Sequence, residues 1–491
     1  MIAEELIYQI HSALRLTPTA EQERAIQTTA LFLSDRRDEA VMILRGSAGT
    51  GKTTLAAAIV RALLLLKQKL VLMAPTGRAA KVFSVYSGQP AHTIHRTIYR
   101  QRSAGDLSSF SLNVNLHQDT LFIVDEASMI ANASSNELFG SGCLLDDLVQ
   151  YVYGGRNCRM LLIGDTAQLP PVGEDASPAL MAGVMRGYGL HTYECQLNEV
   201  LRQSQESGIL FNATLVRNIL SQELEPVEVR LQLKGFADIT IVPGDELIES
   251  LASSYSRVGL DETIVVTRSN KRANIYNQGI RNTILDREGE LCRGDQLMVV
   301  KNNYFVLSVE SSGVRDDSSS LSAKETSLNS PLSTLDYVAN GDHCVVQRVR
   351  NTRELYGFRF ADVTLTFPDY DDFELTCTTL LDTLTTEAPA LTREQQERLF
   401  NAVMDDYADV PYKADRLKKL KNDPYYNALQ VKFGYAVTCH KAQGGQWAHV
   451  YIDQGYMTED MLTSDYVHWL YTALTRATEH VFLVNWPKSQ S

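Results

Sequence analysis

The sequence predicts an α/β protein in which helices cover both faces of parallel sheets, with a small β-module inserted in the chain. Several short apolar runs stop at or just before Gly, Asp, Asn, Pro or Thr, and such runs are typical of buried parallel strands. These runs are Val41–Leu44, Leu70–Met73, Leu121–Val124, Met160–Ile163, Thr263–Val266, His449–Ile452 and Val481–Val484. Ala- and Leu-rich segments such as Thr54–Leu66 favour helices between them. Ligands of such sheets bind at the carboxyl ends of the strands.

The α/β alternation is interrupted in the second half of the chain. The segments Gln296–Val300, His343–Arg348 and Phe358–Phe367 alternate as strands and suggest the inserted β-module. A Ser-rich stretch within it, Ser308–Thr334, is typical of a flexible loop. The following charged segment, Thr392–Lys421, predicts one or two helices, with a break at Pro411.

At ordinary domain sizes, the 491 residues suggest three or four packing units. Charge is unevenly distributed along them. The formal net charge of -13 argues against a protein that coats nucleic acid non-specifically. From Ala40 to Gly105, however, there is no Asp or Glu among many basic residues. A phosphate-binding surface needs only local positive charge, although charge alone slightly favours chance clustering on solvated helix faces as the explanation of this stretch.

The seven cysteines are dispersed, and none has C-x-x-C spacing, so a structural zinc site is not expected. Dispersed thiols in odd number suit a reducing compartment. The first residues, Met1 to Leu16, lack a basic-then-apolar signal pattern, and the run Ala62–Leu66 is too short to cross a bilayer. These features favour a cytoplasmic protein without membrane partners.

A phosphate-binding loop is predicted at Gly46–Thr53, which fits G-x-x-x-x-G-K-[ST] between a strand and a helix. Its glycines would allow backbone N–H groups to surround phosphate oxygens. Lys52 would reach the β- and γ-phosphates, and Thr53 would hold Mg²⁺. The nucleotide-binding residues predicted here are Gly46, Gly49, Thr50, Gly51, Lys52, Thr53 and Thr54. The alternative is a Gly-rich turn that binds nothing.

Two further strand ends carry candidate catalytic side chains. Asp125 and Glu126 follow the run Leu121–Val124, where neighbouring carboxylates repel unless a metal lies near them. Asp125 would act on Mg²⁺, and Glu126 would orient and deprotonate the attacking water. Gln168 follows a third strand and could sense the γ-phosphate, although a Pro-rich turn is the simpler interpretation of that segment taken alone.

Hydrolysis of a nucleotide also requires cations that stabilise charge on the transferred phosphate. Arg202 and Arg476 are candidates, but a single arginine is usually a surface residue and spacing alone selects neither.

In their order along the chain, these motifs resemble those of superfamily 1 helicases, in the RecD-like and Pif-like branch that includes phage Dda. The resemblance runs from about Leu16 to Arg476. It is strongest in the phosphate loop and in the segments 74–81, 125–129, 164–172 and 440–444.

The resemblance implies roles that spacing does not show. Gln22 matches the adenine-recognising glutamine, and Arg202 and Arg476 match arginines that face the γ-phosphate from two sides of a cleft. The implied nucleic-acid contacts are Pro75, Thr76, Thr93, His95, Thr438, His440 and Lys441, and Gly444 is grouped with the nucleotide site. Many relatives have Ser where Ala442 stands, so one hydroxyl contact to the strand is missing here.

The fold implied by the resemblance is a pair of RecA-like P-loop domains. The first would span residues 1–205, and the second would combine 206–290 with 425–491. Residues 291–424 would form an SH3-like module with the Ser-rich loop and a helical extension. A short insertion at 99–118, with Phe110 as its apolar tip, would be a strand-separating wedge or, equally, an ordinary surface hairpin.

The resulting hypothesis is an ATP- and Mg²⁺-dependent 5′-to-3′ DNA helicase or translocase that acts on single-stranded DNA and forked duplexes. It would act in repair, recombination or replication as a monomeric motor, with further repair or replication partners left open. The 5′-to-3′ direction comes only from the resemblance. The alternatives are a P-loop ATPase that works without nucleic acid, a subunit that only docks partners, and an RNA-directed motor.

Overall fold

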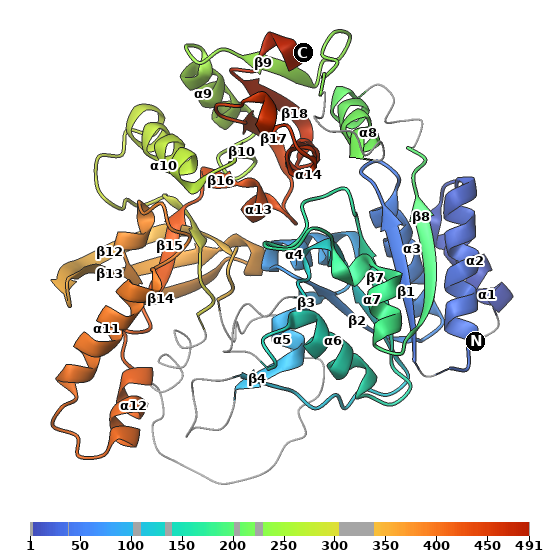
Figure 1. Ribbon diagram of the computed structural model, residues 1–491, viewed down its shortest axis with the longest axis horizontal. Coiled ribbons are helices and arrows are strands. Elements are labelled where there is room, and N and C mark those ends of the chain that lie inside the picture. Colours follow the sequence, from blue (N-terminus) through green and yellow to red (C-terminus); the bar gives the residue numbers. More distant parts are fainter. Residues whose placement is uncertain are drawn as a thin grey trace. The chain divides into compact units, whose positions relative to one another are not determined.

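The computed structural model describes residues 3–37, 39–101, 110–132, 140–200, 207–220, 229–303 and 338–490. It divides into two compact units, residues 1–268 together with 437–491, and residues 269–436 (Figure 1). Three features of the sequence analysis lie outside the described residues: Arg202, the Ser-rich stretch 308–334, and the centre of the proposed wedge at 102–109.

The first unit contains a parallel sheet that begins the chain's α/β alternation. Its strands, in spatial order, are β3 (Ala91–Thr93), β2 (Lys69–Ala74), β6 (Thr120–Val124), β7 (Arg159–Gly164), β1 (Ala40–Gly46) and β8 (His191–Leu197). All neighbouring pairs are parallel, so the carboxyl ends of β6, β7 and β1 lie side by side at one edge. This strand order brings together the three segments that carry the predicted phosphate chemistry.

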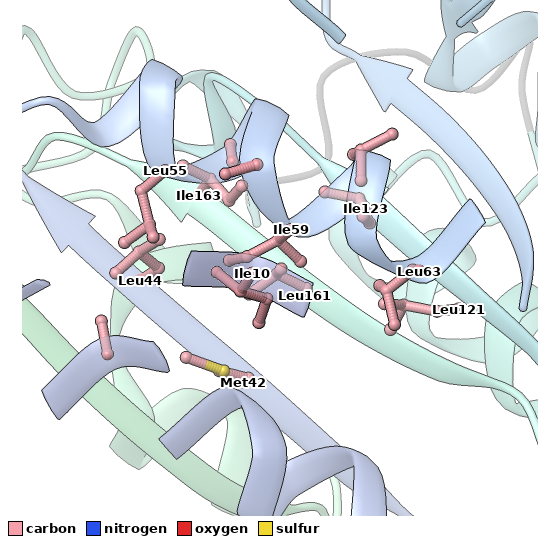
Figure 2. Close-up of a cluster of buried hydrophobic side chains, with 14 of the residues drawn as sticks. Ile10, Met42, Leu44, Leu55, Ile59, Leu63, Leu121, Ile123, Leu161 and Ile163 are labelled. Carbon is pink, nitrogen blue, oxygen red and sulfur yellow. The ribbon is translucent and has the colours of Figure 1, made fainter. Parts of the chain in front are cut away.

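Helices pack on both faces of this sheet. They are α1 (Ala3–Leu14), α2 (Ala20–Ser34), α3 (Lys52–Leu65), α4 (Gly77–Ser87), α5 (Ile94–Ile98), α6 (Leu144–Tyr153) and α7 (Ala182–Gly187). Leu55, Ile59 and Leu63 recur every fourth residue, so α3 presents them as one stripe to the strands (Figure 2). On the opposite face Phe122 of β6 meets Tyr151 of α6, with ring centroids 5.9 Å apart.

The same unit contains a second sheet with the order β16 (Ala436–Thr438), β10 (Thr263–Thr267), β17 (Trp447–Asp453), β18 (Ala477–Val484) and β9 (Ile239–Val242). Its central pairs are parallel. The helices α8 (Gly208–Leu220), α9 (Leu247–Arg257), α13 (Cys439–Ala442) and α14 (Ser464–Leu474) accompany it. Two parallel α/β sheets are typical of RecA-like domains, and the predicted fold class is confirmed.

The second unit is built around a closed barrel. Its strands are β11 (Gln296–Val299), β12 (His343–Leu355), β13 (Phe358–Phe367), β14 (Phe373–Leu380) and β15 (Leu429–Phe433). The helices of this unit are α10 (Asn270–Gly279), α11 (Arg393–Asp406) and α12 (Lys413–Lys421). Phe358 and Phe360 of the barrel pack against Leu399 and Val403 of α11, so the helical extension shares an apolar core with the barrel.

The boundaries of the inserted unit differ from those expected from the sequence. The sequence analysis ended the β-module at residue 424, whereas β15 pairs with β11 and β14 and completes the barrel. Helix α10, which was expected with the second sheet, belongs instead to the unit of residues 269–436 that contains the barrel. A short apolar strand does not reveal its pairing partner, because pairing depends on the folded sheet.

All seven apolar runs form strands, and the shorter or more polar strands were not predicted. Strand β8, for example, has the sequence His-Thr-Tyr-Glu-Cys-Gln-Leu and lies at a sheet edge, where burial is incomplete. The pair β4 (Tyr99–Gln101) and β5 (Phe110–Leu112) forms an antiparallel hairpin at the position of the expected insertion. Within the described ranges, no helix is both long and apolar enough to cross a membrane.

Candidate nucleotide and nucleic-acid site

The phosphate loop joins β1 to α3. Gly49 and Gly51 both have φ of 76°, a left-handed conformation that glycine adopts without strain. Thr50 donates its hydroxyl to the Ser47 carbonyl at 2.8 Å, which closes the loop on itself. Lys52 begins α3, and its Nζ donates to the Gly46 carbonyl at 3.0 Å. The loop therefore has the curvature and the cation that phosphate recognition requires.

The acidic pair lies immediately after β6. Burial and the neighbouring Glu126 raise the pKa of the Asp125 carboxyl to about 6, and the positive charge of Lys52 acts in the opposite direction. Glu126 itself has a left-handed φ of 52°, which is uncommon for a residue with a side chain. Its backbone N–H donates to Asp125 Oδ1 at 2.9 Å. Two adjacent carboxylates in a partly desolvated place are electrostatically suited to a bound cation.

Gln168 connects the acidic pair to the second sheet. With its amide oriented so that both ends are satisfied, Gln168 donates to Glu126 Oε2 at 3.3 Å and accepts from Arg476 Nη2 at 3.2 Å. Arg476 is 3% exposed, and its Nη1 also donates to the Gly445 carbonyl at 3.2 Å. The structure thus brings together one residue after β6, one after β7 and one after α14.

The segment after β7 makes further hydrogen bonds with elements of the second sheet. Thr472 Oγ1 of α14 accepts from the Leu169 backbone N–H at 2.7 Å, and His468 Nδ1 lies 2.9 Å from the Ala167 carbonyl. Gln443, just after α13, donates to the Leu169 carbonyl at 2.7 Å. Residues 165–169 are therefore held by side chains from α14 and the end of α13.

Gln22 lies against the phosphate loop. Its Nε2 donates to the Thr50 carbonyl at 3.0 Å, and its Oε1 accepts from the Thr19 backbone N–H at 3.1 Å. Thr19 in turn caps α2, so the capping box sets the position of the Gln22 side chain. One Nε2 hydrogen remains for another acceptor, because a side-chain amide has two N–H groups.

The two turns expected to touch nucleic acid follow β2 and β3, at the same edge of the sheet as the phosphate loop. Thr76 caps α4 by accepting from Ala79 N–H at 3.2 Å, and Thr93 caps α5 by accepting from Arg96 N–H at 3.2 Å. Pro75 is partly exposed beside Thr76. Each turn therefore presents the N-terminus of a helix, which carries partial positive charge.

The third predicted contact segment begins at Thr438, which caps α13 without a side-chain hydrogen bond. His440 is exposed, and burial lowers the pKa of Lys441 to about 8, so Lys441 remains mostly protonated at neutral pH. Gly444 has φ of 73°, and a Cβ there would lie 3.0 Å from Ala79 Cβ and 3.1 Å from Thr76 Oγ1. Gly444 therefore lies against the turn after β2, and its expected contact with nucleotide stays a prediction.

Two further residues at this site are Arg78, which the sequence placed among the basic residues of the stretch from Ala40 to Gly105, and Tyr471, which had no predicted role. Arg78 stacks over Trp447 at 4.6 Å from the ring centroid and donates to the Gln446 carbonyl at 2.9 Å. Tyr471 contacts the phosphate loop, as described below. His468 and Thr472 lie four residues apart on α14, and this spacing was a signal for a shared helix face in this region.

His95 provides a test by acid titration. Burial lowers the pKa of its imidazole from 6.5 to about 4, although Asp147 acts in the opposite direction. The folded chain thus binds this proton more weakly than the unfolded chain does. The contribution of His95 to stability is therefore fully present above pH 6.5 and is lost progressively as the pH falls toward about 4.

We expect His95→Gln to flatten the dependence of the unfolding free energy on pH in this window, by up to about 1.4 kcal/mol per pH unit. Urea denaturation of both chains, without nucleic acid, measures the two slopes. His191→Gln changes an exposed histidine and should leave the slope unaltered. Equal slopes for the original chain and His95→Gln would contradict the lowered pKa of His95.

The fold and this geometry define a class: a phosphate-loop protein with two RecA-like sheets, in which Glu126 of the acidic pair and Arg476 beside the second sheet meet at Gln168. Comparisons with known proteins find families that this chain resembles. Residues 17–224 match the AAA domain family, and residues 433–484 match the UvrD-like helicase C-terminal domain.

Two characterised relatives share these motifs. The ATP-dependent RecD2 DNA helicase of Deinococcus radiodurans is 30% identical over 193 residues, which cover 39% of this chain and 24% of the relative. The ATP-dependent DNA helicase dda of Enterobacteria phage T4 is 26% identical over 300 residues, which cover 58% of this chain and 62% of the relative. The matches thus span less than two thirds of either relative. The chain is thus similar to superfamily 1 helicases of the RecD-like and Dda branch, the group that its motifs indicated.

Among solved structures, a Pif1 helicase from Bacteroides in complex with ADP-AlF3 and ssDNA is 14% identical. The match covers 97% of this chain and 94% of that one, with a TM-score of 0.46.

Proposed function

We propose that the chain is an ATP-dependent DNA helicase or translocase that moves 5′ to 3′ along single-stranded DNA. The observation that carries this proposal is the arrangement at Gln168, which joins Glu126 beside the phosphate loop to Arg476 of the second sheet. A nucleotide switch needs the loop and the acidic pair. A motor also needs a contact that hydrolysis can make or break between its two RecA-like domains. Arg476 would supply that contact.

The residues at the phosphate loop fit a nucleotide and a magnesium ion. Asp125 and Thr53 would hold the ion. Among the described residues no three His, Cys, Asp or Glu side chains gather as a metal cage, which suits an ion that takes other ligands from phosphate and water. When bound, Mg²⁺ would neutralise charge on the phosphate oxygens. The high pKa of Asp125 supports this assignment, since a cation would stabilise its ionised form.

The remaining catalytic roles follow from donor and acceptor chemistry. Lys52 would bind phosphate oxygens, and Glu126 would accept a proton from the attacking water. Gln168 would orient Glu126, and Arg476 would stabilise charge on the transferred phosphate together with Arg202. Gln22 would use its remaining N–H for the nucleotide base. Gly46, Gly49, Thr50, Gly51 and Thr54 would complete the loop around the phosphates.

Single-stranded DNA would bind at the same edge of the first sheet as the phosphate loop, over the turns that follow β2 and β3. Pro75, Thr76 and Thr93 belong to turns whose helix N-termini favour phosphate. His95 would contribute hydrogen bonds and little charge, since it is neutral at physiological pH. Thr438, His440 and Lys441 would bind the strand from the second sheet, and Gly444 would link the two sets of contacts.

The domain assignment remains part of the proposal. Residues 1–205 would be one motor domain and residues 206–268 with 437–491 the other, while residues 269–436, which contain the barrel, would include the SH3-like module. The hairpin of β4 and β5 would belong to a strand-separating wedge at 99–118. The motor would act as a monomer on forked duplexes in repair, recombination or replication.

Unwinding of forked duplexes tests this proposal. We expect ATP-dependent strand separation of a fork with a 5′ single-stranded tail, and little with only a 3′ tail. The rate should fall steeply as salt increases, because phosphate contacts release counterions. An ATPase rate that ignores single-stranded DNA would favour the nucleic-acid-independent switch, and selective unwinding of RNA forks would favour an RNA motor.

A further inference from the structure

The hydroxyl of Tyr471 joins three segments at the phosphate loop. This side chain lies on α14 and is 1% exposed. Its hydroxyl donates to Asp165 Oδ2 at 2.5 Å and accepts from the backbone N–H of Ala48 at 2.8 Å. Ala48 lies inside the phosphate loop, and Asp165 directly follows β7. One hydroxyl group therefore contacts the loop, the segment that carries Gln168, and the helix that precedes Arg476.

The direction of these hydrogen bonds is determined by chemistry. An ionised carboxylate only accepts, and a backbone N–H only donates. Asp165 also accepts from the Ala167 N–H through Oδ1 at 3.0 Å, which orients the carboxylate. Burial and the nearby Asp165 raise the pKa of Tyr471 well above its ordinary value, so its hydroxyl keeps its proton. The chain of donors thus runs from Ala48 through Tyr471 to Asp165.

The position of Tyr471 on α14 places it close to the arginine. Thr472, the next residue, accepts from Leu169 N–H, and the helix ends at Leu474, two residues before Arg476. Tyr471 lies in the last turn of α14, so it is close in the chain to the segment that carries Arg476. A displacement of Ala48 would therefore be transmitted through Tyr471 to the part of α14 that positions Arg476.

We propose that Tyr471 is a positioning residue that couples the conformation of the phosphate loop to α14 and Arg476. This inference rests on the proposed ATP-dependent function, since it describes how occupancy of the loop reaches the second sheet. Tyr471 would not touch the reacting atoms. A conformational change of the loop at Ala48 would shift Arg476 through the hydroxyl of Tyr471.

The test compares Tyr471→Phe with Tyr466→Phe. Tyr466 is also buried on α14, and its hydroxyl donates to Gln454 at 2.6 Å rather than to the phosphate loop. Both changes remove one buried hydroxyl, so both should lower the melting temperature. Only Tyr471→Phe should lower the single-stranded-DNA-stimulated kcat, by about 5- to 10-fold, as expected for one lost hydrogen bond. The KM for ATP should change much less.

A second readout is the affinity for labelled oligo-dT with and without a non-hydrolysable ATP analogue. In Tyr471→Phe the ratio of the two Kd values should move toward 1, while Tyr466→Phe should keep the ratio of the original chain. If Tyr471→Phe keeps both kcat and the ratio, the proposal is overturned. Equal losses in both variants would also overturn it, because they would indicate a purely structural effect.

If Tyr471→Phe does not fold, Asp165→Asn provides the same test. It keeps the side-chain shape and removes the negative charge that orients the hydroxyl. We expect the same shift of the Kd ratio toward 1, and an unaltered ratio would overturn the proposal. Lys52→Ala separates the two proposals: if it retains hydrolysis, the proposed ATPase site is wrong, whereas if it abolishes hydrolysis and Tyr471→Phe has no effect, only the coupling is wrong.

Discussion

Lys52→Ala is expected to reduce ATP hydrolysis about 100- to 1000-fold, a loss of about 3–4 kcal/mol of transition-state stabilisation. Lys52 is the cation of the phosphate loop, and its Nζ lies at the Gly46 carbonyl. Its removal would leave developing negative charge on the phosphate without a partner from the loop. It would also remove the charge that holds down the pKa of Asp125. A colorimetric phosphate assay at saturating ATP and single-stranded DNA measures the effect.

The fold should survive this change, because alanine is the best helix former and Lys52 is only partly buried at the start of α3. Circular dichroism and the melting temperature check that point. Lys69→Ala is the matched control. It removes an exposed lysine at the amino end of β2, the edge opposite the phosphate loop, and should keep hydrolysis near the original rate. Normal turnover by Lys52→Ala would refute the assigned loop.

Glu126→Gln is expected to bind ATP and single-stranded DNA yet to lower kcat by about 100- to 10,000-fold, the range for loss of a general base. Glutamine keeps the shape of the side chain but cannot accept the proton of the attacking water. It also removes the like charge that raises the pKa of Asp125, so cation binding should not suffer. Single-turnover hydrolysis and a fluorescent nucleotide titration separate chemistry from binding.

Glu479→Gln changes an exposed glutamate on β18 and should leave kcat unaltered. A Glu126→Gln rate close to that of the original chain would mean that another group deprotonates the water. Weak nucleotide binding by the same variant would instead place Glu126 among the binding residues. The hydrogen bond from Gln168 favours Glu126 as the general base over Glu126 as a nucleotide-binding residue, because Gln168 orients the Glu126 carboxylate from outside the phosphate loop.

Much of the fold was predictable because its signals are local. The seven apolar runs became strands, since a buried parallel strand must be apolar along its whole length. The phosphate loop was predictable for the same reason, because eight consecutive residues carry both its glycines and its lysine. The weaker strands were missed where they lie at edges, as in β8, whose residues are partly exposed and partly polar.

The stretch from Ala40 to Gly105, which lacks Asp and Glu, gave less reliable information than the phosphate loop. Its basic residues invite a single phosphate-binding surface, yet they do not share one edge. Lys69 lies at the amino end of β2, whereas Thr76 follows its carboxyl end. The Arg78 guanidinium stacks on the Trp447 ring. Local positive charge therefore does not show which side chains lie at the candidate site.

The sequence by itself determined the phosphate loop, the acidic pair after its strand, and the alternation that builds two α/β sheets. Each of these depends on residues that are neighbours along the chain. Only the tertiary structure decided that Gln168 lies between Glu126 and Arg476, that Tyr471 reaches Ala48, and that burial keeps His95 neutral. These features depend on strand order and desolvation, which arise when distant segments pack and which no local pattern encodes.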